Sequence, residues 1–269
     1  MSARHSQREE VTYRRRYVGT VEYHRSRYGH GYASMAVYRF ECVGERSGPD
    51  YVLVHGIGVS AKAYGPTAVE LVEHSDVLLV DLPGYGRSPR PDIDMTIADH
   101  AKVLSDFLAD RNLDHPLVVG HSMGTQVVAE LAADYPDQID HIALIAPVIV
   151  PEARSLPGAA RLLLRNGRLE PLSVTAMAVQ DYLFGAGIPY MMQQTKHLLG
   201  ARIEELAEQI TAKTLVICGD TDPIVPLEWG QYLAASLRHG WYETVPGPHA
   251  TMFAAPKLIA DLLYEHGLR

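Results

Sequence analysis

Cysteine, long apolar runs and metal-binding motifs are scarce in this sequence. Only Cys42 and Cys218 occur among the 269 residues, and we expect them to be buried free thiols rather than a disulfide. The 13 histidines form no cluster with metal-ligand spacing, which predicts no metal, and nothing else indicates a cofactor. No apolar stretch approaches the ~20 residues of a membrane span, and the N-terminus has no signal-peptide core. We therefore expect a cytoplasmic protein without a membrane partner.

Positive charge is also in short supply. The chain has 24 Lys and Arg against 32 Asp and Glu, which gives a formal net charge of -8. Phosphate binding usually needs a clustered excess of basic residues, so nucleic acid is not an expected partner. Residues 1–30 carry seven Arg against three Glu, which we interpret as a solvated edge strand rather than a binding arm. A small-molecule substrate remains, and the sequence leaves the oligomeric state open.

Short apolar runs recur along the chain, with helical patterns between them. Nearly unbroken apolar runs occupy residues 51–55, 76–81, 116–120, 139–147 and 214–219. Such runs are typical of strands covered on both faces, as in a parallel sheet. Residues 96–112 and 123–136 have apolar residues at helical spacing, and residues 35–44 predict an early antiparallel strand. The alternation predicts an α/β fold with a doubly wound, mostly parallel sheet.

One region interrupts the alternation. Residues 148–208 contain no strand signal and instead hold several helical patterns separated by Gly and Pro. A stretch of about 60 residues is too long for an ordinary crossover between strands. Because it leaves and re-enters the sheet at the strand ends where α/β proteins carry ligands, we expect a helical cap rather than helices packed elsewhere on the surface. The core then consists of residues 1–147 and 209–269.

A serine follows the third of the parallel-type runs. In GHSMG, residues 120–124, Ser122 lies between a predicted strand and a predicted helix. A nucleophile on such a turn needs small neighbours, and Gly120 and Gly124 supply them. A serine hydroxyl also needs a base that a third group orients. Asp222 follows the run 214–219, and His249 follows a further predicted strand, WYETV (241–245), so the order is serine, acid, histidine.

With these motifs in place, the chain resembles α/β-hydrolase fold proteins of the capped type over nearly its whole length. The supporting stretches are HGIG (55–58), DLPGYGRS (81–88), GHSMG (120–124), GDTDPIVP (219–226) and His249. The resemblance implies that Ser122 is the nucleophile, His249 the general base and Asp222 the orienting acid, with Asp220 as the rival acid. It also implies an oxyanion hole formed by the backbone N–H groups of Ile57 and Met123.

Other side chains near these motifs have less specific interpretations. His55 and Asp81 are expected to fix turns. His121 could be structural or could line the substrate pocket. Four residues of the cap could line an acyl pocket, or could equally form the cap's own core: Tyr182, Phe184, Met191 and Met192.

The resemblance also narrows the chemistry. Similar epoxide hydrolases and haloalkane dehalogenases use an aspartate where Ser122 stands, so those reactions are disfavoured. Similar enzymes that cleave carbon–carbon bonds usually have an aromatic residue where Ala250 follows His249, so that match is poor. We expect a serine hydrolase that cleaves a carboxylic ester, thioester or lactone with a small to medium, largely apolar acyl group. Alternatives with the same triad are a thioesterase, an amidase, a perhydrolase or a carbon–carbon bond hydrolase. A non-catalytic ligand receptor is the alternative from another class.

Overall fold

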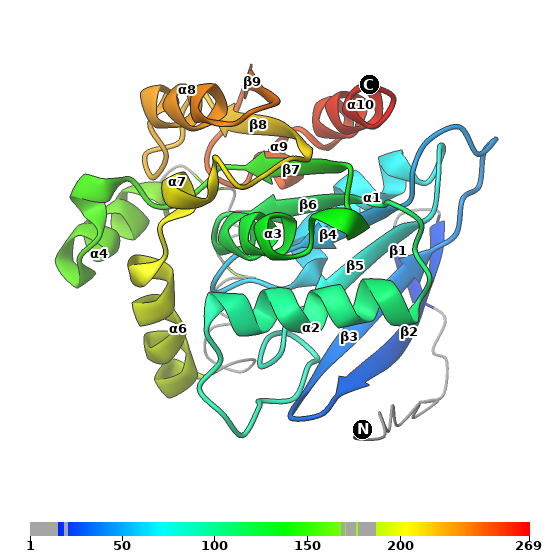
Figure 1. Cartoon of the computed structure of the whole chain (residues 1–269), viewed down its shortest axis with the longest axis horizontal. Coiled ribbons are helices and arrows are strands. Elements are labelled where there is room, and N and C mark those ends of the chain that lie inside the picture. The colour runs from blue at the N-terminus through cyan, green and yellow to red at the C-terminus, as the bar shows by residue number, and fades with distance from the viewer. Residues whose placement is uncertain (1–15, 19–20, 168–169, 171–175, 177–186) are drawn as a thin grey trace.

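The computed structural model describes residues 16–18, 21–167, 170, 176 and 187–269. Within these residues a sheet runs through the centre of the molecule (Figure 1). Its strands are β1 (Arg16–Val18), β2 (Val21–His30), β3 (Ala33–Phe40), β4 (Tyr51–Val54), β5 (Val77–Asp81), β6 (Leu117–His121), β7 (His141–Ile145), β8 (Lys213–Gly219) and β9 (Gly240–Val245). Their spatial order is β1-β2-β3-β5-β4-β6-β7-β8-β9.

The ladder from β5 through β4, β6, β7 and β8 to β9 is parallel throughout, whereas β1, β2, β3 and β5 pair antiparallel. Every residue of β4, β5 and β6 is buried, as expected for strands that helices cover on both faces. The predicted α/β fold with a mostly parallel sheet is therefore confirmed, and β3 is the predicted antiparallel strand. Strand β1 lies at the edge of the sheet.

Helices flank this sheet. They are α1 (Gly65–Leu71), α2 (Ile97–Asp110), α3 (Met123–Asp134), α8 (Leu227–Ser236), α9 (Thr251–Ala254) and α10 (Pro256–Gly267). Helices α2 and α3 pack together on one side, and α1 and α10 pack together on the other (Figure 1). The two layers cover the central strands and bury their apolar side chains in one core.

Helix α2 illustrates how local sequence sets an element. At its start, the backbone N–H of Asp99 donates to Thr96 Oγ1 at 3.1 Å, and the backbone N–H of Thr96 donates to Asp99 Oδ2 at 2.8 Å. This reciprocal capping box satisfies two donors that a helix start otherwise leaves unpaired. One face of the helix, including Val103, Leu104 and Phe107, is buried. The predicted helix at 96–112 thus has the bounds Ile97–Asp110.

The described residues between 148 and 208 form helices and turns and contain no strand. They include α4 (Leu156–Asn166), α6 (Ile188–Gly200) and α7 (Ile203–Leu206). Buried polar side chains tie α6 to the core. Tyr190 donates from its hydroxyl to Pro83 O at 2.8 Å, and Gln194 donates to Met95 O at 2.9 Å. Gln126 of α3 donates to both Val148 O and Leu198 O.

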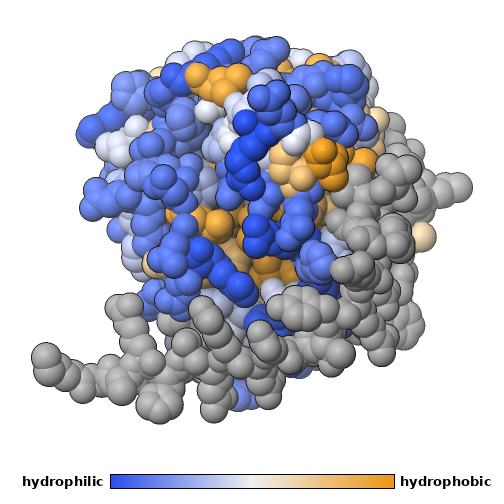
Figure 2. All heavy atoms as spheres, turned by 90° about the vertical axis from the view of Figure 1, so that its right-hand side faces the viewer, coloured by the Kyte–Doolittle hydropathy of each residue, from blue (hydrophilic) through white to orange (hydrophobic). Residues whose placement is uncertain are grey.

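Hydrophilic residues cover most of the face in Figure 2, with a smaller hydrophobic area near its centre. Both cysteines are free; Cys218 is buried as expected, but Cys42 is only partly buried because it lies just after β3. None of the helices formed by the described residues is long and apolar enough to cross a membrane.

Candidate active site

Ser122 stands at a sharp turn between β6 and α3. Its backbone has φ 54° and ψ -121°, a left-handed conformation that costs a non-glycine residue about 1–3 kcal/mol. Neighbouring bonds hold the turn, because the N–H of Ser122 donates to Ile145 O at 3.0 Å and its carbonyl accepts from Thr125 N at 2.9 Å. The turn presents the serine at the end of β6, above the carboxyl edge of the sheet.

The two flanking glycines permit this turn by close backbone contact. A Cβ placed on Gly120 would lie 2.3 Å from the carbonyl oxygen of Gly124. A Cβ on Gly124 would lie 2.5 Å from the carbonyl oxygen of Val54. Both separations are far below van der Waals contact, so the expectation that side chains would collide at these positions is confirmed.

His249 and Asp222 meet from separate loops. Asp222 follows β8 and His249 follows β9, and His249 Nδ1 donates to Asp222 Oδ2 at 2.8 Å. The other carboxylate oxygen, Oδ1, accepts from the N–H groups of Ile224 at 2.7 Å and Val225 at 3.2 Å. The Asp222 side chain is fully buried. Because Nδ1 carries the proton, the opposite nitrogen of His249, Nε2, is free to accept one.

Asp220, the rival acid, occupies a different position. It is exposed, and its Oδ1 accepts from the backbone N–H of Gly247 at 2.9 Å. That bond joins the loop after β8 to the loop that leads to His249. The geometry therefore pairs His249 with Asp222, and Asp220 supports the turn beside them.

The electrostatic surroundings of His249 favour its charged form. Burial alone would lower the pKa of His249, because it disfavours the imidazolium. The charge of Asp222, its hydrogen bond to Nδ1 and the charge of Glu170 together outweigh burial and raise the pKa of His249 above its ordinary value. An imidazolium that forms here during a reaction is stabilised by two carboxylates.

The loop after β4 passes directly against Ser122. A Cβ on Gly56 would lie 2.7 Å from the Cβ of Ser122. The next residue, Ile57, lines the same cavity as Ser122. Met123 is the first residue of α3, so its backbone N–H has no partner within the helix. The two residues expected to supply oxyanion donors are therefore a residue of the loop that passes against Ser122 and the residue that follows Ser122 in the chain.

His55 and Asp81 hold this loop in position. His55 Nε2 accepts from Leu82 N at 3.0 Å, and Nδ1 donates to Gly56 O at 2.7 Å. Asp81 accepts from the Tyr38 hydroxyl and from the backbone N–H groups of Ala61 and Arg87, each at 2.8 Å. Both side chains are buried and fully engaged in turn contacts, which agrees with the structural interpretation made from the sequence.

His121 supports the histidine loop from below. Its Nε2 donates to the carbonyl oxygen of His249 at 3.1 Å, and the two rings are 4.9 Å apart. Complete burial lowers the pKa of His121 well below its ordinary value, with the neighbouring His249 contributing to the shift. A neutral His121 can fix the position of His249 without adding a positive charge beside it.

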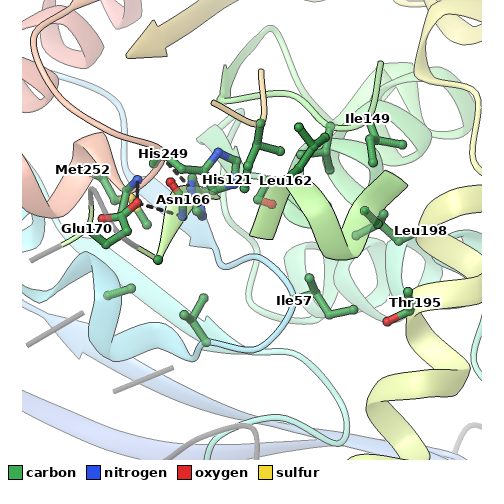
Figure 3. A pocket seen from close by; sticks show the side chains of 18 residues that line it. Ile57, His121, Ile149, Leu162, Asn166, Glu170, Thr195, Leu198, His249 and Met252 are labelled. Carbon is green, nitrogen blue, oxygen red and sulfur yellow. Dashed lines mark hydrogen bonds between the residues drawn. The ribbon is translucent and has the colours of Figure 1, made fainter. Parts of the chain in front are cut away.

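An apolar cavity of about 230 Å³ lies between the core and the helices of residues 148–208. Ser122 and His249 line it, and Figure 3 labels His249 among the lining side chains. Most of the other described residues that line it are apolar: Ile57, Val59, Ala63, Val148, Ile149, Ala159, Leu162, Leu198, Ile224, Ala250 and Met252. His121 also lines the cavity, as one of its two sequence interpretations predicted.

The expected pocket residues of the cap do not form its described lining. Met191 is fully buried in the core beneath α6, one turn before Thr195, which does face the cavity. Met192 follows it on the outer face of the helix and is 57% exposed. The register of α6 on the core, which Tyr190 and Gln194 fix, explains this difference. Tyr182 and Phe184 lie outside the described residues.

Sequence reasoning missed two polar residues at this site, Asn166 and Glu170. Asn166 ends α4, and Glu170 follows four residues later. Glu170 Oε1 accepts from Ala250 N at 2.9 Å and from Asn166 Nδ2 at 3.2 Å, and Figure 3 shows both beside His249. A single carboxylate and amide within a helical stretch form no motif, so the sequence held no signal for them.

Comparisons with known proteins show which proteins this chain is similar to. A family model described as alpha/beta hydrolase fold matches residues 52–168. The pimeloyl-[acyl-carrier protein] methyl ester esterase of Chromobacterium violaceum is 31% identical over 81% of this chain and 94% of its own length. A putative carbamate hydrolase of Yersinia enterocolitica is 28% identical over 78% of this chain and 85% of its own. The crystal structure of an enol-lactonase from Burkholderia xenovorans superposes with a TM-score of 0.74 at 21% identity, covering 88% of this chain and 97% of that one.

Proposed function

This chain belongs to the α/β hydrolase fold family and is an enzyme of that fold, and we propose that it hydrolyses a carboxylic ester through an acyl-enzyme. The observation that carries the proposal is the hydrogen bond from His249 Nδ1 to the buried carboxylate of Asp222, beside a serine on a strained turn. It gives the imidazole the tautomer that a general base for Ser122 requires. The receptor alternative falls away, since the chain is an enzyme.

The proposed reaction begins at the serine hydroxyl. His249 Nε2 takes the proton from Ser122 Oγ as the oxygen attacks the ester carbonyl, and the carbonyl oxygen becomes an oxyanion. The backbone N–H groups of Ile57 and Met123 would donate to this oxyanion, where one such donor is typically worth about 3 kcal/mol. Asp222 and Glu170 stabilise the imidazolium that forms. The tetrahedral intermediate collapses when His249 returns the proton to the departing alcohol.

Deacylation repeats these steps with water in place of the alcohol. His249 removes a proton from the water as it attacks the acyl carbonyl, and the imidazolium then protonates Ser122 Oγ as the acid is released. His121 would help throughout by holding the His249 carbonyl at 3.1 Å, which limits movement of the loop.

The cavity supports a small to medium, largely apolar acyl group. Its volume of about 230 Å³ and its aliphatic lining suit a short acyl chain or a compact ring. Residues of α4 and α6, including Ala159, Leu162 and Leu198, form part of its wall. For that reason we also propose that residues 148–208 act as a cap that shapes the acyl site.

The experiment that tests this proposal compares three proteins on short-chain p-nitrophenyl esters. We expect wild type to show a burst and steady turnover, and Ser122→Ala to show neither. The control is Ser236→Ala, a partly exposed serine at the end of α8 whose hydroxyl donates to Tyr232 O within the same helix, and it should match wild type. A fluorophosphonate should label Ser122, and mass spectrometry should locate the adduct.

The outcomes separate the proposal from its competitors. Equal rates for wild type and Ser122→Ala would contradict it. If Ser122 is labelled but thioesters, lactones, amides or peracids are turned over in preference to esters, the assignment of Ser122 as nucleophile stands. The proposal that the enzyme cleaves an ester bond is then wrong. Circular dichroism of each variant establishes that a lost rate reflects chemistry and not unfolding.

A further inference from the structure

Two buried side-chain oxygen atoms belong to residues that line the apolar cavity. Glu170 Oε2 and Asn166 Oδ1 are both buried, and neither has a hydrogen-bond partner among the described residues. Both residues line the cavity that contains Ser122 and His249. A buried acceptor without a partner costs about 1–3 kcal/mol, and more when it is charged. Two such acceptors in neighbouring residues call for an explanation.

The remaining polar atoms of this pair are already occupied. Glu170 Oε1 accepts from Ala250 N and from Asn166 Nδ2, at 2.9 Å and 3.2 Å. The backbone N–H of Glu170 donates to the carbonyl of Asn166 at 3.1 Å. These bonds fix both side chains, so their two orphan oxygens are held in place rather than free to seek partners elsewhere.

The geometry points to Asn166 and Glu170 as a recognition site for a hydrogen-bond donor on the substrate, either a primary ammonium or a hydroxyl group. This inference rests on the proposed ester hydrolysis, and it adds a polar feature to an otherwise apolar substrate. Both orphan atoms are acceptors, so a donor group suits them and an acceptor is repelled. A primary ammonium has three N–H donors and could serve both oxygens, whereas a hydroxyl could serve one.

The position of the pair sets where the donor must lie. Glu170 bonds to Ala250, the residue after His249, so the pair stands at the catalytic end of the cavity (Figure 3). The opposite end is lined by Ile149, Thr195 and Leu198. We therefore expect the donor to be a few bonds from the reacting carbonyl, not at the far end of a long chain.

Replacement of Glu170 by Gln reverses the chemistry of the orphan atom while it preserves the shape. The amide oxygen of Gln can accept from Ala250 N and Asn166 Nδ2 as Oε1 does now. Its NH₂ group then occupies the place of Oε2 and presents donors to the substrate. The variant should lose the preference for a substrate donor. The matched control is Glu152→Gln, an exposed carboxylate in the turn Pro151–Ala153 of the same segment.

The test uses two series of esters that differ only in one terminal group. The first is X–(CH₂)n–CO–OCH₃ and the second is the acetates X–(CH₂)n–O–CO–CH₃, where X is methyl, ammonium or hydroxyl and n runs from short to longer spacers. The readout at each n is kcat/KM for the ester in which X is ammonium or hydroxyl, divided by kcat/KM for the ester in which X is methyl. This ratio cancels any effect of the substitution on the chemical steps that all esters share.

We expect the wild-type ratio to peak at a short spacer in one series, and Glu170→Gln to reduce it by about tenfold to a hundredfold, the factor that a hydrogen bond to a charged group is worth. Glu152→Gln should leave the ratio unchanged. A peak for ammonium and hydroxyl alike indicates hydrogen bonding as the source, and a peak for ammonium alone indicates that charge pairing dominates. Ratios that are the same in wild type and Glu170→Gln at every n, in both series, would overturn the inference.

A binding measurement keeps this result distinct from a failure of the proposed function. If no ester in which X is methyl is cleaved, the proposal of ester hydrolysis is wrong. Calorimetric titration of Ser122→Ala with the same esters then tests the site without turnover. Esters in which X is ammonium or hydroxyl should bind Ser122→Ala more tightly than esters in which X is methyl. The added substitution Glu170→Gln should remove that difference in affinity. An identical affinity order in the two proteins would contradict the role of Glu170.

Discussion

Replacement of Asp222 by Asn changes one atom and should disable the imidazole. In the folded chain, Asp222 accepts three hydrogen bonds, two from the backbone of its own loop and one from His249 Nδ1. Asn keeps an oxygen that can accept the two backbone bonds. Its NH₂ group then faces Nδ1, which must become an acceptor, and the imidazole proton moves to Nε2. That nitrogen can no longer take the proton of Ser122.

The magnitude follows from this change of tautomer. The equivalent substitution in serine proteases lowers kcat by about 10⁴, which corresponds to about 5.5 kcal/mol of barrier. Stability should change little, since the fully buried side chain keeps its volume and its two backbone bonds. We expect the midpoint of thermal unfolding to fall by less than about 4 °C, the shift that ~1 kcal/mol produces in a chain of this size.

The assay is steady-state hydrolysis of a short-chain p-nitrophenyl ester, with thermal unfolding followed in parallel. Asp220→Asn is the matched control, because the Asn oxygen can still accept from Gly247 N as Asp220 Oδ1 does. It should retain activity within about threefold, below the effect of one lost hydrogen bond. A loss below tenfold in Asp222→Asn, or an equal loss in Asp220→Asn, would refute the assignment of the acid.

Three further outcomes are expected. An unperturbed histidine has a pKa of about 6.5. Because Asp222 and Glu170 raise the pKa of His249 in the free enzyme, the acid limb of the kcat/KM profile should be centred above that value, and a rate that is flat from pH 5 to 8 would contradict the base role. Gly56→Ala should lower kcat by about 10² to 10³, because its Cβ must displace Ser122 or the oxyanion loop. Gly200→Ala should leave kcat unchanged, because a Cβ there meets no atom within 4 Å. Equal kcat values in the two variants would refute the close approach of Gly56 to Ser122. Burial lowers the pKa of His100 to about 4, so below about pH 6.5 the unfolded chain binds a proton that the folded chain refuses, and the free energy of unfolding should fall as pH drops from 7 to 5. Urea titrations should show that the free energy of unfolding falls less between pH 7 and 5 in His100→Gln than in wild type. An equal fall in the two proteins would argue against His100 as the source of the pH dependence.

The prediction of the central strands and the expected grouping of Ser122, Asp222 and His249 have a shared physical basis. Buried parallel strands need continuous apolar runs, so β4 to β8 are visible as such runs. The residues that follow those strands meet at one edge of the sheet, which is why Ser122, Asp222 and His249 could be grouped although they are far apart in the chain. The glycines beside Ser122 strengthened that grouping.

Pocket residues could not be obtained in the same way. Met191 and Met192 are adjacent apolar residues on one helix, and only the seating of α6 on the core decides that the first is buried and the second is 57% exposed. That seating depends on contacts with Pro83 and Met95, which lie about a hundred residues away along the chain. Glu170 depends on a similar long-range contact, to Ala250.

The side chain of Gln126 links two parts of the molecule that a protein engineer would wish to treat separately. It projects from α3, the helix that begins directly after Ser122, and donates to the carbonyls of Val148 and Leu198, two residues that line the cavity. The α6 wall is thereby registered to Ser122. Substitutions that are intended to change the shape of the cavity are better placed at Ala159 and Leu162 on α4, where new side chains can alter the cavity wall while the register between α6 and Ser122 stays intact.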